Sequence, residues 1–389
     1  MDRFHALVIG GGGTGAAVAH DLTLRGLQVT LVERGELTSG TTGRHHGLLH
    51  SGARYAVKDQ ESAIECIEEN TILRRIAPGT FEENDGLFVA ISDEDLAYSH
   101  AFIEGCQECG IPVRRLTREQ TLRLEPNLNP NLKMAVQVPD ATMDAMRMPL
   151  RFFATAQHNG AVIKPFTEVV DFIKYGHNVT GARVHDLTNG QEYDIKADII
   201  INAGGPWSGK IAHMVDVDVP IRPSPGVMLA LRGRLCNMVV NRLHTSGDGD
   251  IVVPQRGLSV VGTSSWVVDD PDDLGVPEEH VQLMVEKGAE LIPMVKTAPF
   301  RGVWSAARPL IGPRGEDSGR ELSRTFKCFD HQDEGAEGFV TITGGKATTL
   351  RGMAEAASNV VCQKLGVDAP CRTREVVLLP HTAYYRHSP

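Results

Sequence analysis

A glycine-rich turn near the start of the chain most limits what this sequence can fold into. Residues 10–15 read GGGGTG and lie between a strand-like apolar segment, residues 6–9, and a helix-like segment, residues 16–24. A second apolar segment follows at residues 29–32. A strand, a glycine turn, a helix and a second strand in this order predict the first unit of a doubly wound α/β sheet.

The glycines of this turn have the spacing of a dinucleotide site. Gly10, Gly12 and Gly15 fill a G-x-G-x-x-G frame, in which glycine lets the backbone approach a pyrophosphate and lets the helix pack closely on the strand. The N–H groups at the helix N-terminus then face the phosphates. Glu33 ends the second strand, where a carboxylate can accept hydrogen bonds from a ribose. A glycine turn with a purely structural role is the alternative.

The composition is that of a soluble globular protein. The chain has 389 residues, of which 41% are hydrophobic and 23% charged, so we expect two or three domains. The formal net charge of −10 argues against a nucleic-acid binder and against electrostatic docking on anionic lipid. An anionic substrate would therefore need a local cluster of basic side chains.

We expect no signal peptide, no membrane span and no metal site. The glycine turn begins by residue 10, and no apolar run approaches the ~18 residues that cross a bilayer. Seven scattered cysteines are typical of reduced thiols in a cytoplasmic protein. Cys106 and Cys109 form a C-x-x-C inside a helix-like segment, residues 93–109, and are expected to be structural thiols.

Three distant segments have the character of one nucleotide-binding domain. Residues 1–55, 197–207 and 338–346 each contain a strand that runs into a glycine turn. Ligands of doubly wound sheets lie at the carboxyl ends of the strands, so these turns should converge on one crevice. The domain is therefore expected to be discontinuous, with other material inserted between its pieces.

The inserted material is rich in strand signals. Residues 86–91, 251–254 and 258–262 are short β candidates, and residues 277–291 look helical. We therefore expect an α/β fold with a discontinuous Rossmann-like domain, built on a parallel sheet, and a β-rich (α+β) cap. The expected boundaries are 1–80, 147–212 and 332–370 for the nucleotide domain, 81–146 and 213–331 for the cap, and 371–389 for a C-terminal tail.

The segment at residues 38–55 favours a flavin over a nicotinamide. It is rich in glycine and small hydroxyl residues, and its length is typical of a functional loop. The late turn at Gly344 and Gly345 precedes a helix-like segment and can aim N–H groups at the pyrimidine end of an isoalloxazine. That end becomes anionic on reduction, so the turn would favour the reduced flavin.

Five motifs spread along the chain carry a family resemblance. They are TTGRHHGLLHSGARYAV (41–57), NAGGPW (202–207), VVGTSS (260–265), ARPL (307–310) and ITGGKATT (342–349). Through them the chain resembles the flavin-dependent glycerol-3-phosphate dehydrogenases, most closely the A subunit of the anaerobic bacterial enzyme. The resemblance implies a fold of the D-amino-acid-oxidase/glycerol-3-phosphate-dehydrogenase type and non-covalent FAD. It also implies hydride transfer from sn-glycerol 3-phosphate to flavin N5, which yields dihydroxyacetone phosphate, and delivery of electrons towards a quinone.

Two features depart from the family pattern. The A subunit of the anaerobic enzyme continues into a cysteine-rich domain associated with an iron–sulfur cluster, whereas this chain stops at Pro389. Single-chain aerobic relatives carry a histidine where Val227 stands here, so no role of that histidine transfers. The resemblance further implies two partners, of which one is a second flavoprotein subunit, and the other is a membrane-attached iron–sulfur subunit. A cytoplasmic protein, held at the inner membrane through such a partner, is the expected location.

Oxidation of a phosphorylated alcohol indicates which side chains the substrate site needs. Arginine forks suit a phosphate dianion, and a histidine that titrates near working pH suits the hydroxyl proton. The resemblance places Arg54 and Arg308 at substrate-contacting positions. His45 and His46 compete with His50 as the base. We expect His50, Arg308 and Lys346 to be catalytic, and Arg54, Tyr55, Arg308, Arg324 and Lys346 to bind the substrate.

The expected cofactor contacts come from all three glycine turns and from the early loop. They are Gly10, Gly12, Gly13, Thr14, Gly15, Glu33, Arg34, Thr41, Thr42, Arg44, His45, His46, Gly47, Leu49, Ala203, Gly204, Trp207, Gly344, Gly345, Lys346, Ala347 and Thr348.

Two other functions stay open at this point. The first is an FAD enzyme for an L-2-hydroxy acid such as L-2-hydroxyglutarate, because arginine binds carboxylates as well as phosphates. The second is a non-catalytic flavoprotein subunit, whose bound flavin no alcohol would reduce.

Overall fold

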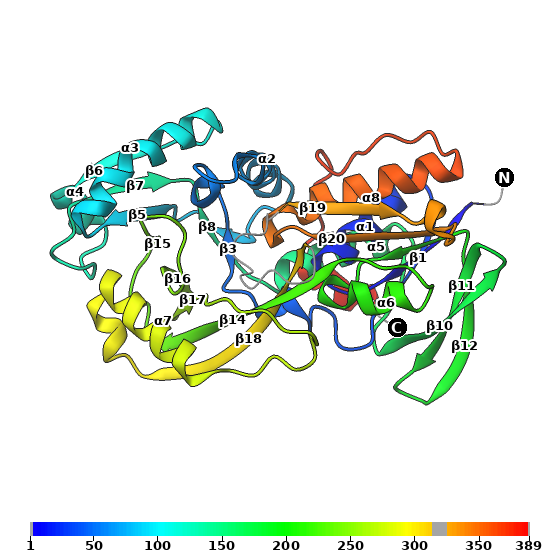
Figure 1. The fold of residues 1–389 in the computed structure, drawn as a ribbon. Coiled ribbons are helices and arrows are strands. Elements are labelled where there is room, and N and C mark those ends of the chain that lie inside the picture. The colour runs from blue at the N-terminus through cyan, green and yellow to red at the C-terminus, as the bar shows by residue number, and fades with distance from the viewer. Residues whose placement is uncertain (1–2, 313–324, 388–389) are drawn as a thin grey trace.

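The computed structural model describes residues 3–312 and 325–387, and two large sheets organise them (Figure 1). The first sheet has the strand order β19-β20-β13-β1-β2-β9, and its neighbours run parallel except at the edge, where β19 is antiparallel to β20. Its strands are β1 (His5–Ile9), β2 (Gln28–Val32), β9 (Val162–Lys164), β13 (Ile199–Asn202), β19 (Phe326–Asp330) and β20 (Phe339–Gly344). This is the α/β sheet expected from the sequence.

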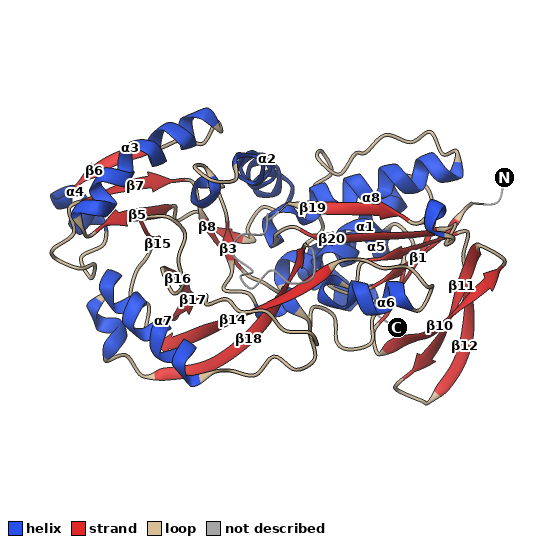
Figure 2. Ribbon diagram, viewed as in Figure 1, coloured by secondary structure: helices blue, strands red, loops and turns tan. Residues whose placement is uncertain are grey.

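Helices cover one face of this sheet, and a small sheet covers the other (Figure 2). On the first face lie α1 (Gly13–Leu24), α5 (Arg147–His158) and α8 (Leu350–Leu365). The second face carries α6 (Ser208–His213) and an antiparallel sheet of β10 (Thr167–Tyr175), β11 (Asn178–Asp186) and β12 (Gln191–Lys196). Because apolar layers cover both faces, the central strands are continuous apolar runs rather than alternating ones.

The second large sheet forms the cap, with α3, α4 and α7 packed on it (Figure 1). Its order is β18-β14-β17-β16-β15-β5-β7-β6. The strands are β5 (Gly86–Ala90), β6 (Arg114–Thr117), β7 (Met134–Val138), β14 (Ile221–Arg232), β15 (Val239–Arg242), β16 (Ile251–Gln255), β17 (Leu258–Gly262) and β18 (Phe300–Ile311), and the helices are α3 (Asp93–Glu108), α4 (Arg118–Leu124) and α7 (Glu278–Leu291). The β candidates at 86–91, 251–254 and 258–262 and the helix at 277–291 are confirmed.

Smaller elements connect the two halves. A three-stranded sheet joins β3 (Leu48–Leu49), β8 (Ala141–Met143) and β4 (Phe81–Glu82), and α2 (Gln60–Ile76) follows the early loop. That loop contains 3-10 turns at Thr41–Arg44 and Ala53–Tyr55, and the C-terminal segment ends in α9 (Tyr384–His387).

One expected domain boundary differs from the sheet pairing. β19 pairs with β20 in the six-stranded sheet, although the boundary at residue 332 assigned this strand to the cap. Its short apolar pattern resembles the cap strands, and only the pairing shows which sheet it joins. The other boundaries stay a prediction. In the described part of the chain, no helix has both the length and the apolar character needed to cross a bilayer.

Candidate functional site

A cavity of about 1610 Å³ lies where the carboxyl ends of β1, β2, β13 and β20 face the cap. The three glycine turns meet there, as the sequence predicted, because Gly10, Gly204 and Gly344 all line it. Most expected cofactor residues line it too: Gly10, Gly12, Gly13, Thr14, Glu33, Arg34, Thr41, Thr42, Arg44, His45, His46, Ala203, Gly204, Trp207, Gly344, Gly345, Lys346 and Ala347. The expected catalytic and substrate residues His50, Arg54, Tyr55, Arg308 and Lys346 share the same cavity.

Four expected cofactor residues do not line the cavity. A Cβ on Gly15 would lie 1.9 Å from the Gly10 carbonyl oxygen, so this glycine serves helix–strand packing. Gly47 packs on Gln255, and the Leu49 side chain is fully buried in the core. The Thr348 hydroxyl accepts a hydrogen bond from the His50 N–H at 3.0 Å. Arg324, an expected substrate ligand, lies outside the described residues.

The dinucleotide end of the cavity is built from backbone. Gly10 has φ +113°, and a Cβ there would lie 2.5 Å from the Ala203 carbonyl oxygen, so only glycine fits. The first turn of α1 contains no acidic residue, and its Gly13 N–H donates to the Thr42 hydroxyl at 3.0 Å. Such an end attracts an anion through its N–H groups and the helix dipole.

Glu33 supports this turn as well as facing the cavity. Its Oε2 accepts a hydrogen bond from the Gly11 N–H at 2.7 Å, and its Oε1 accepts one from the Gly35 N–H at 2.8 Å. Each carboxylate oxygen can accept more than one hydrogen bond, so a ribose hydroxyl can still bind here.

An acidic strap crosses the same end. We call residues 263–277, between β17 and α7, the strap; its Pro271, Asp272 and Leu274 line the cavity. Asp272 accepts hydrogen bonds from Arg34 at 2.6 Å and from the Trp207 indole at 2.8 Å. Lys210 pairs with Asp270 at 2.7 Å and with Asp272 at 3.1 Å.

The strap gives Arg34 and Trp207 a role that sequence reasoning missed. The two side chains also contact each other, with the Arg34 guanidinium carbon 4.7 Å from the Trp207 ring centroid. The signal in the sequence was the acidic run DDPDD at residues 269–273.

At the other end, aromatic rings and cations from distant segments come together. The Lys346 Nζ lies 5.1 Å from the Tyr55 ring centroid, and the His50 and Tyr55 ring centroids are 5.6 Å apart. Lys346 also approaches Glu65 of α2, with 3.7 Å between Nζ and Oε2. The early loop and the late turn are therefore neighbours.

Burial keeps the histidines of this site neutral. It lowers the pKa of His50 to about 3, helped by the positive charges of Arg54 and Lys346, and it lowers the pKa of His45 to about 4. The pKa of His46 falls well below its usual value for the same reason. The prediction of His50 as the base rests on histidine titrating near working pH, and the lowered pKa removes that reason. A neutral ring nitrogen can nevertheless accept a proton.

Carbonyl groups of the cap orient Arg308, which lies on β18. Its Nη1 donates to Ser224 O at 3.2 Å, and its Nη2 donates to Ser264 O at 3.2 Å and to the Thr263 hydroxyl. Val227, on the neighbouring β14, is fully buried in the cap core. Val227, where the resemblance implied a histidine in aerobic relatives, therefore adds no polar group to this cavity.

Arg54 is held by the cap loop between β15 and β16. Its Nη2 donates to Gly247 O at 3.0 Å and to Asp250 Oδ1 at 2.7 Å. Asp250 was missed in the sequence, where the turn-forming stretch HTSGDGD, residues 244–250, was the signal.

Two N–H groups of the late glycine turn are hydrogen-bonded within the protein. The Gly345 N–H donates to Thr325 O at 3.1 Å, and the Lys346 N–H donates to the Thr349 hydroxyl at 3.0 Å. These two N–H groups are used within the protein, so they are not the ones that face a flavin, and the contact of the rest of this turn with the cofactor stays a prediction. Positive φ values at Gly344 and Gly345 (+86° and +68°) instead let the chain turn sharply so that Lys346 enters the cavity.

Comparison with known proteins adds to this geometry. The family model described as FAD dependent oxidoreductase matches residues 5–355. The chain is 45% identical over 384 residues to the A1 subunit of anaerobic glycerol-3-phosphate dehydrogenase from Haloferax volcanii, covering 95% of this chain and 65% of that protein. It is 42% identical over 375 residues to the A subunit of the same enzyme from Escherichia coli, covering 96% and 69%. It thus spans about two thirds of the length of these relatives.

Solved structures share the fold. The glycerol-3-phosphate dehydrogenase from Bacillus halodurans complexed with FAD matches with a TM-score of 0.74 and 25% identity, over 99% of this chain and 70% of that one. Glycine oxidase from Geobacillus kaustophilus matches with a TM-score of 0.75 and 20% identity, over 97% and 99%. The expected fold type is confirmed.

Proposed function

We propose that this chain binds FAD non-covalently and oxidises sn-glycerol 3-phosphate to dihydroxyacetone phosphate. The chain belongs to the FAD-dependent oxidoreductase family and, within it, to the A subunits of anaerobic glycerol-3-phosphate dehydrogenase. The observation that carries the proposal is the three-cation cluster of Arg54, Arg308 and Lys346, which lines one cavity with the glycine turns. In a chain with a net charge of −10, such a cluster suits an anionic substrate.

The residues of the dinucleotide end fit FAD. A Cβ at Gly10 would meet a carbonyl oxygen, the α1 N-terminus offers N–H groups without a competing acid, and Glu33 faces the same space. When bound, FAD supplies the hydride acceptor. We assign Gly10, Gly12, Gly13 and Thr14 to the pyrophosphate.

The three-cation cluster would bind the substrate phosphate and orient the alcohol. Arg54 and Arg308 offer planar forks, and Lys346 offers a point charge. His50 would accept the hydroxyl proton at a ring nitrogen. Arg54 and Lys346 help to lower the pKa of His50, so a phosphate dianion bound between them would offset their charge and raise that pKa. The substrate would thus strengthen its own base.

Electron delivery belongs to the same proposal. The relatives are named as subunits of an anaerobic enzyme, and we propose that two further proteins of such an assembly, a second flavoprotein and a membrane-attached iron–sulfur protein, pass the electrons towards a quinone. The chain would then work in the cytoplasm, held at the inner membrane through such a partner.

The direct test is anaerobic addition of sn-glycerol 3-phosphate to the flavin-loaded protein. We expect loss of the oxidised-flavin absorbance with this substrate and not with L-2-hydroxyglutarate. Reduction by the hydroxy acid alone would favour the hydroxy-acid enzyme, and no reduction by either would favour a non-catalytic flavoprotein.

Arg308→Ala tests the phosphate contact. The variant should raise KM about 10- to 100-fold, since one or two charge-assisted hydrogen bonds are lost, while flavin stays bound. Arg301→Ala, at an exposed position of the same strand β18, is the matched control. An unchanged KM in Arg308→Ala would remove Arg308 from the site.

A further inference from the structure

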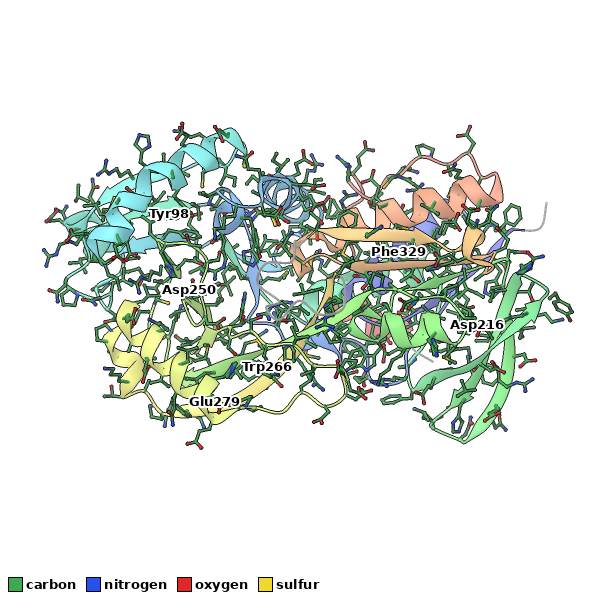
Figure 3. All side chains as sticks on the ribbon, viewed as in Figure 1. Tyr98, Asp216, Asp250, Trp266, Glu279 and Phe329 are labelled. Carbon is green, nitrogen blue, oxygen red and sulfur yellow. The ribbon has the colours of Figure 1, made fainter. Side chains whose placement is uncertain are left out.

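A buried carboxylate stands directly behind Arg54. The side chain of Asp250 is 3% exposed and that of Arg54 is 11% exposed, with 2.7 Å between Oδ1 and Nη2. The other oxygen, Oδ2, accepts a hydrogen bond from the Gly247 N–H at 2.9 Å and lies 3.3 Å from the His244 Nε2. Figure 3 labels Asp250 and Tyr98 in the cap half of the molecule, and Tyr98 lines the cavity.

We propose that Asp250 is a positioning residue, which fixes the direction in which the Arg54 guanidinium faces the substrate. This inference rests on the proposed function. Both hydrogen bonds that Arg54 donates to the cap, to Gly247 O and to Asp250, use Nη2. Because the guanidinium is rigid and planar, a fixed Nη2 also sets the direction of Nη1 and Nε.

The pair spans the two halves of the protein. Arg54 lies in the 3-10 turn Ala53–Tyr55 of the early loop, whereas Asp250 precedes β16 of the cap. The Ser246 hydroxyl donates to Arg54 O at 3.3 Å, so the same cap loop also holds the Arg54 backbone. Asp250 therefore sets where the arginine stands relative to Arg308, which the cap carries on β18.

The charge of Asp250 orients Arg54 but also weakens the attraction between Arg54 and a bound phosphate. Burial opposes its ionisation, but the charge of Arg54 and three hydrogen bonds hold the pKa of Asp250 below its usual value. An ionised carboxylate beside Arg54 reduces the positive potential felt by a phosphate. Loss of the Asp250 charge should therefore disturb the orientation of Arg54 without weakening the attraction of the site for phosphate. This difference separates a positioning role from a merely structural one.

The test compares turnover with simple anion binding in the flavin-loaded protein. In Asp250→Asn, we expect kcat/KM for sn-glycerol 3-phosphate to fall about 100-fold, the size of a misplacement near 1 Å. Inhibition by inorganic phosphate, which needs charge but little orientation, should be as strong as in the wild type or stronger. Asp250→Glu keeps the charge, displaces it by one methylene, and should show the same pattern if the first variant folds poorly.

Two further variants make the test specific. Asp21→Asn breaks a buried pair between Asp21 of α1 and the C-cap residue Arg25, 2.9 Å apart, and should leave both readouts unchanged. In an Arg54→Gln background, Asp250→Asn should cause no further loss, because a positioning residue acts through the arginine.

Two results would overturn the positioning role. The first is an unchanged kcat/KM in Asp250→Asn and Asp250→Glu, and the second is an additive loss in the Arg54→Gln background. A wild-type flavin that sn-glycerol 3-phosphate does not reduce would contradict the proposed function instead, so the two failures are distinguishable.

Discussion

His20 shows how burial alone changes the chemistry of a side chain. It lies in α1, is fully buried, and meets the Phe152 ring edge-on, with 5.6 Å between the ring centroids. No group in residues 3–312 or 325–387 hydrogen-bonds either of its ring nitrogens. Burial lowers its pKa to about 4, so the folded protein holds the ring neutral where an unfolded chain would protonate it.

The pH dependence of stability should therefore change in His20→Leu. Below the ordinary histidine pKa the unfolded chain binds more protons, so the folded state loses stability as pH falls towards about 4. Between about pH 7 and about pH 5, His20 should account for about 2 kcal/mol of this loss. Urea unfolding at both pH values measures it. His100→Leu, at an exposed position of α3, is the control and should keep the wild-type change of unfolding free energy with pH. If this change is equal in the two variants, His20 titrates normally in the folded protein.

At the level of elements, the sequence predicted the structure correctly where the signal lies in residues that are close together in the chain. The first strand, turn and helix were predicted because an apolar run, a glycine spacing and a small-residue helix are local patterns. α8, β17 and α7 followed from the same kind of signal. The pairing of β19 with β20 was not predicted, because this partner can be identified only from the assembled sheet.

The strap should control how fast the cofactor leaves. Asp272→Ala removes the contacts with Arg34, Trp207 and Lys210. An exposed ion pair contributes about 1 kcal/mol or less, so FAD should dissociate about fivefold faster. Recovery of flavin fluorescence after dilution measures the rate. Asp273→Asn, the control, changes a neighbouring strap residue without touching these contacts. Equal rates of FAD dissociation in the two variants would show that the strap does not retain the cofactor.

At the scale of the whole molecule, the cavity lies between two halves that already contact each other. The Thr41 hydroxyl of the early loop donates to Ala307 O at 2.6 Å, and the Trp304 indole of the cap donates to Arg44 O at 2.6 Å. A ligand that fills the cavity should therefore stabilise both halves together.

Removal of FAD should lower the thermal midpoint of the whole protein. A ligand at 100 times its Kd adds about 2.7 kcal/mol to the stability of the state that binds it. We expect calorimetry to show one transition that moves down by several degrees in the flavin-free protein. ADP, which matches only the dinucleotide end, should restore part of the shift. A thermal midpoint that neither FAD nor ADP changes would show that the cofactor does not bind in this cavity.

The sequence by itself predicted a dinucleotide site, and it determined the convergence of three glycine turns and the cations available for an anionic substrate. These follow from residues that are close in the chain, since glycine spacing, strand ends and charge are local properties. The tertiary structure alone decided that Asp250 holds Arg54, that His50 is neutral, and that the strap covers Arg34 and Trp207. Each depends on burial or on a partner far away in the sequence, and no local pattern reports either.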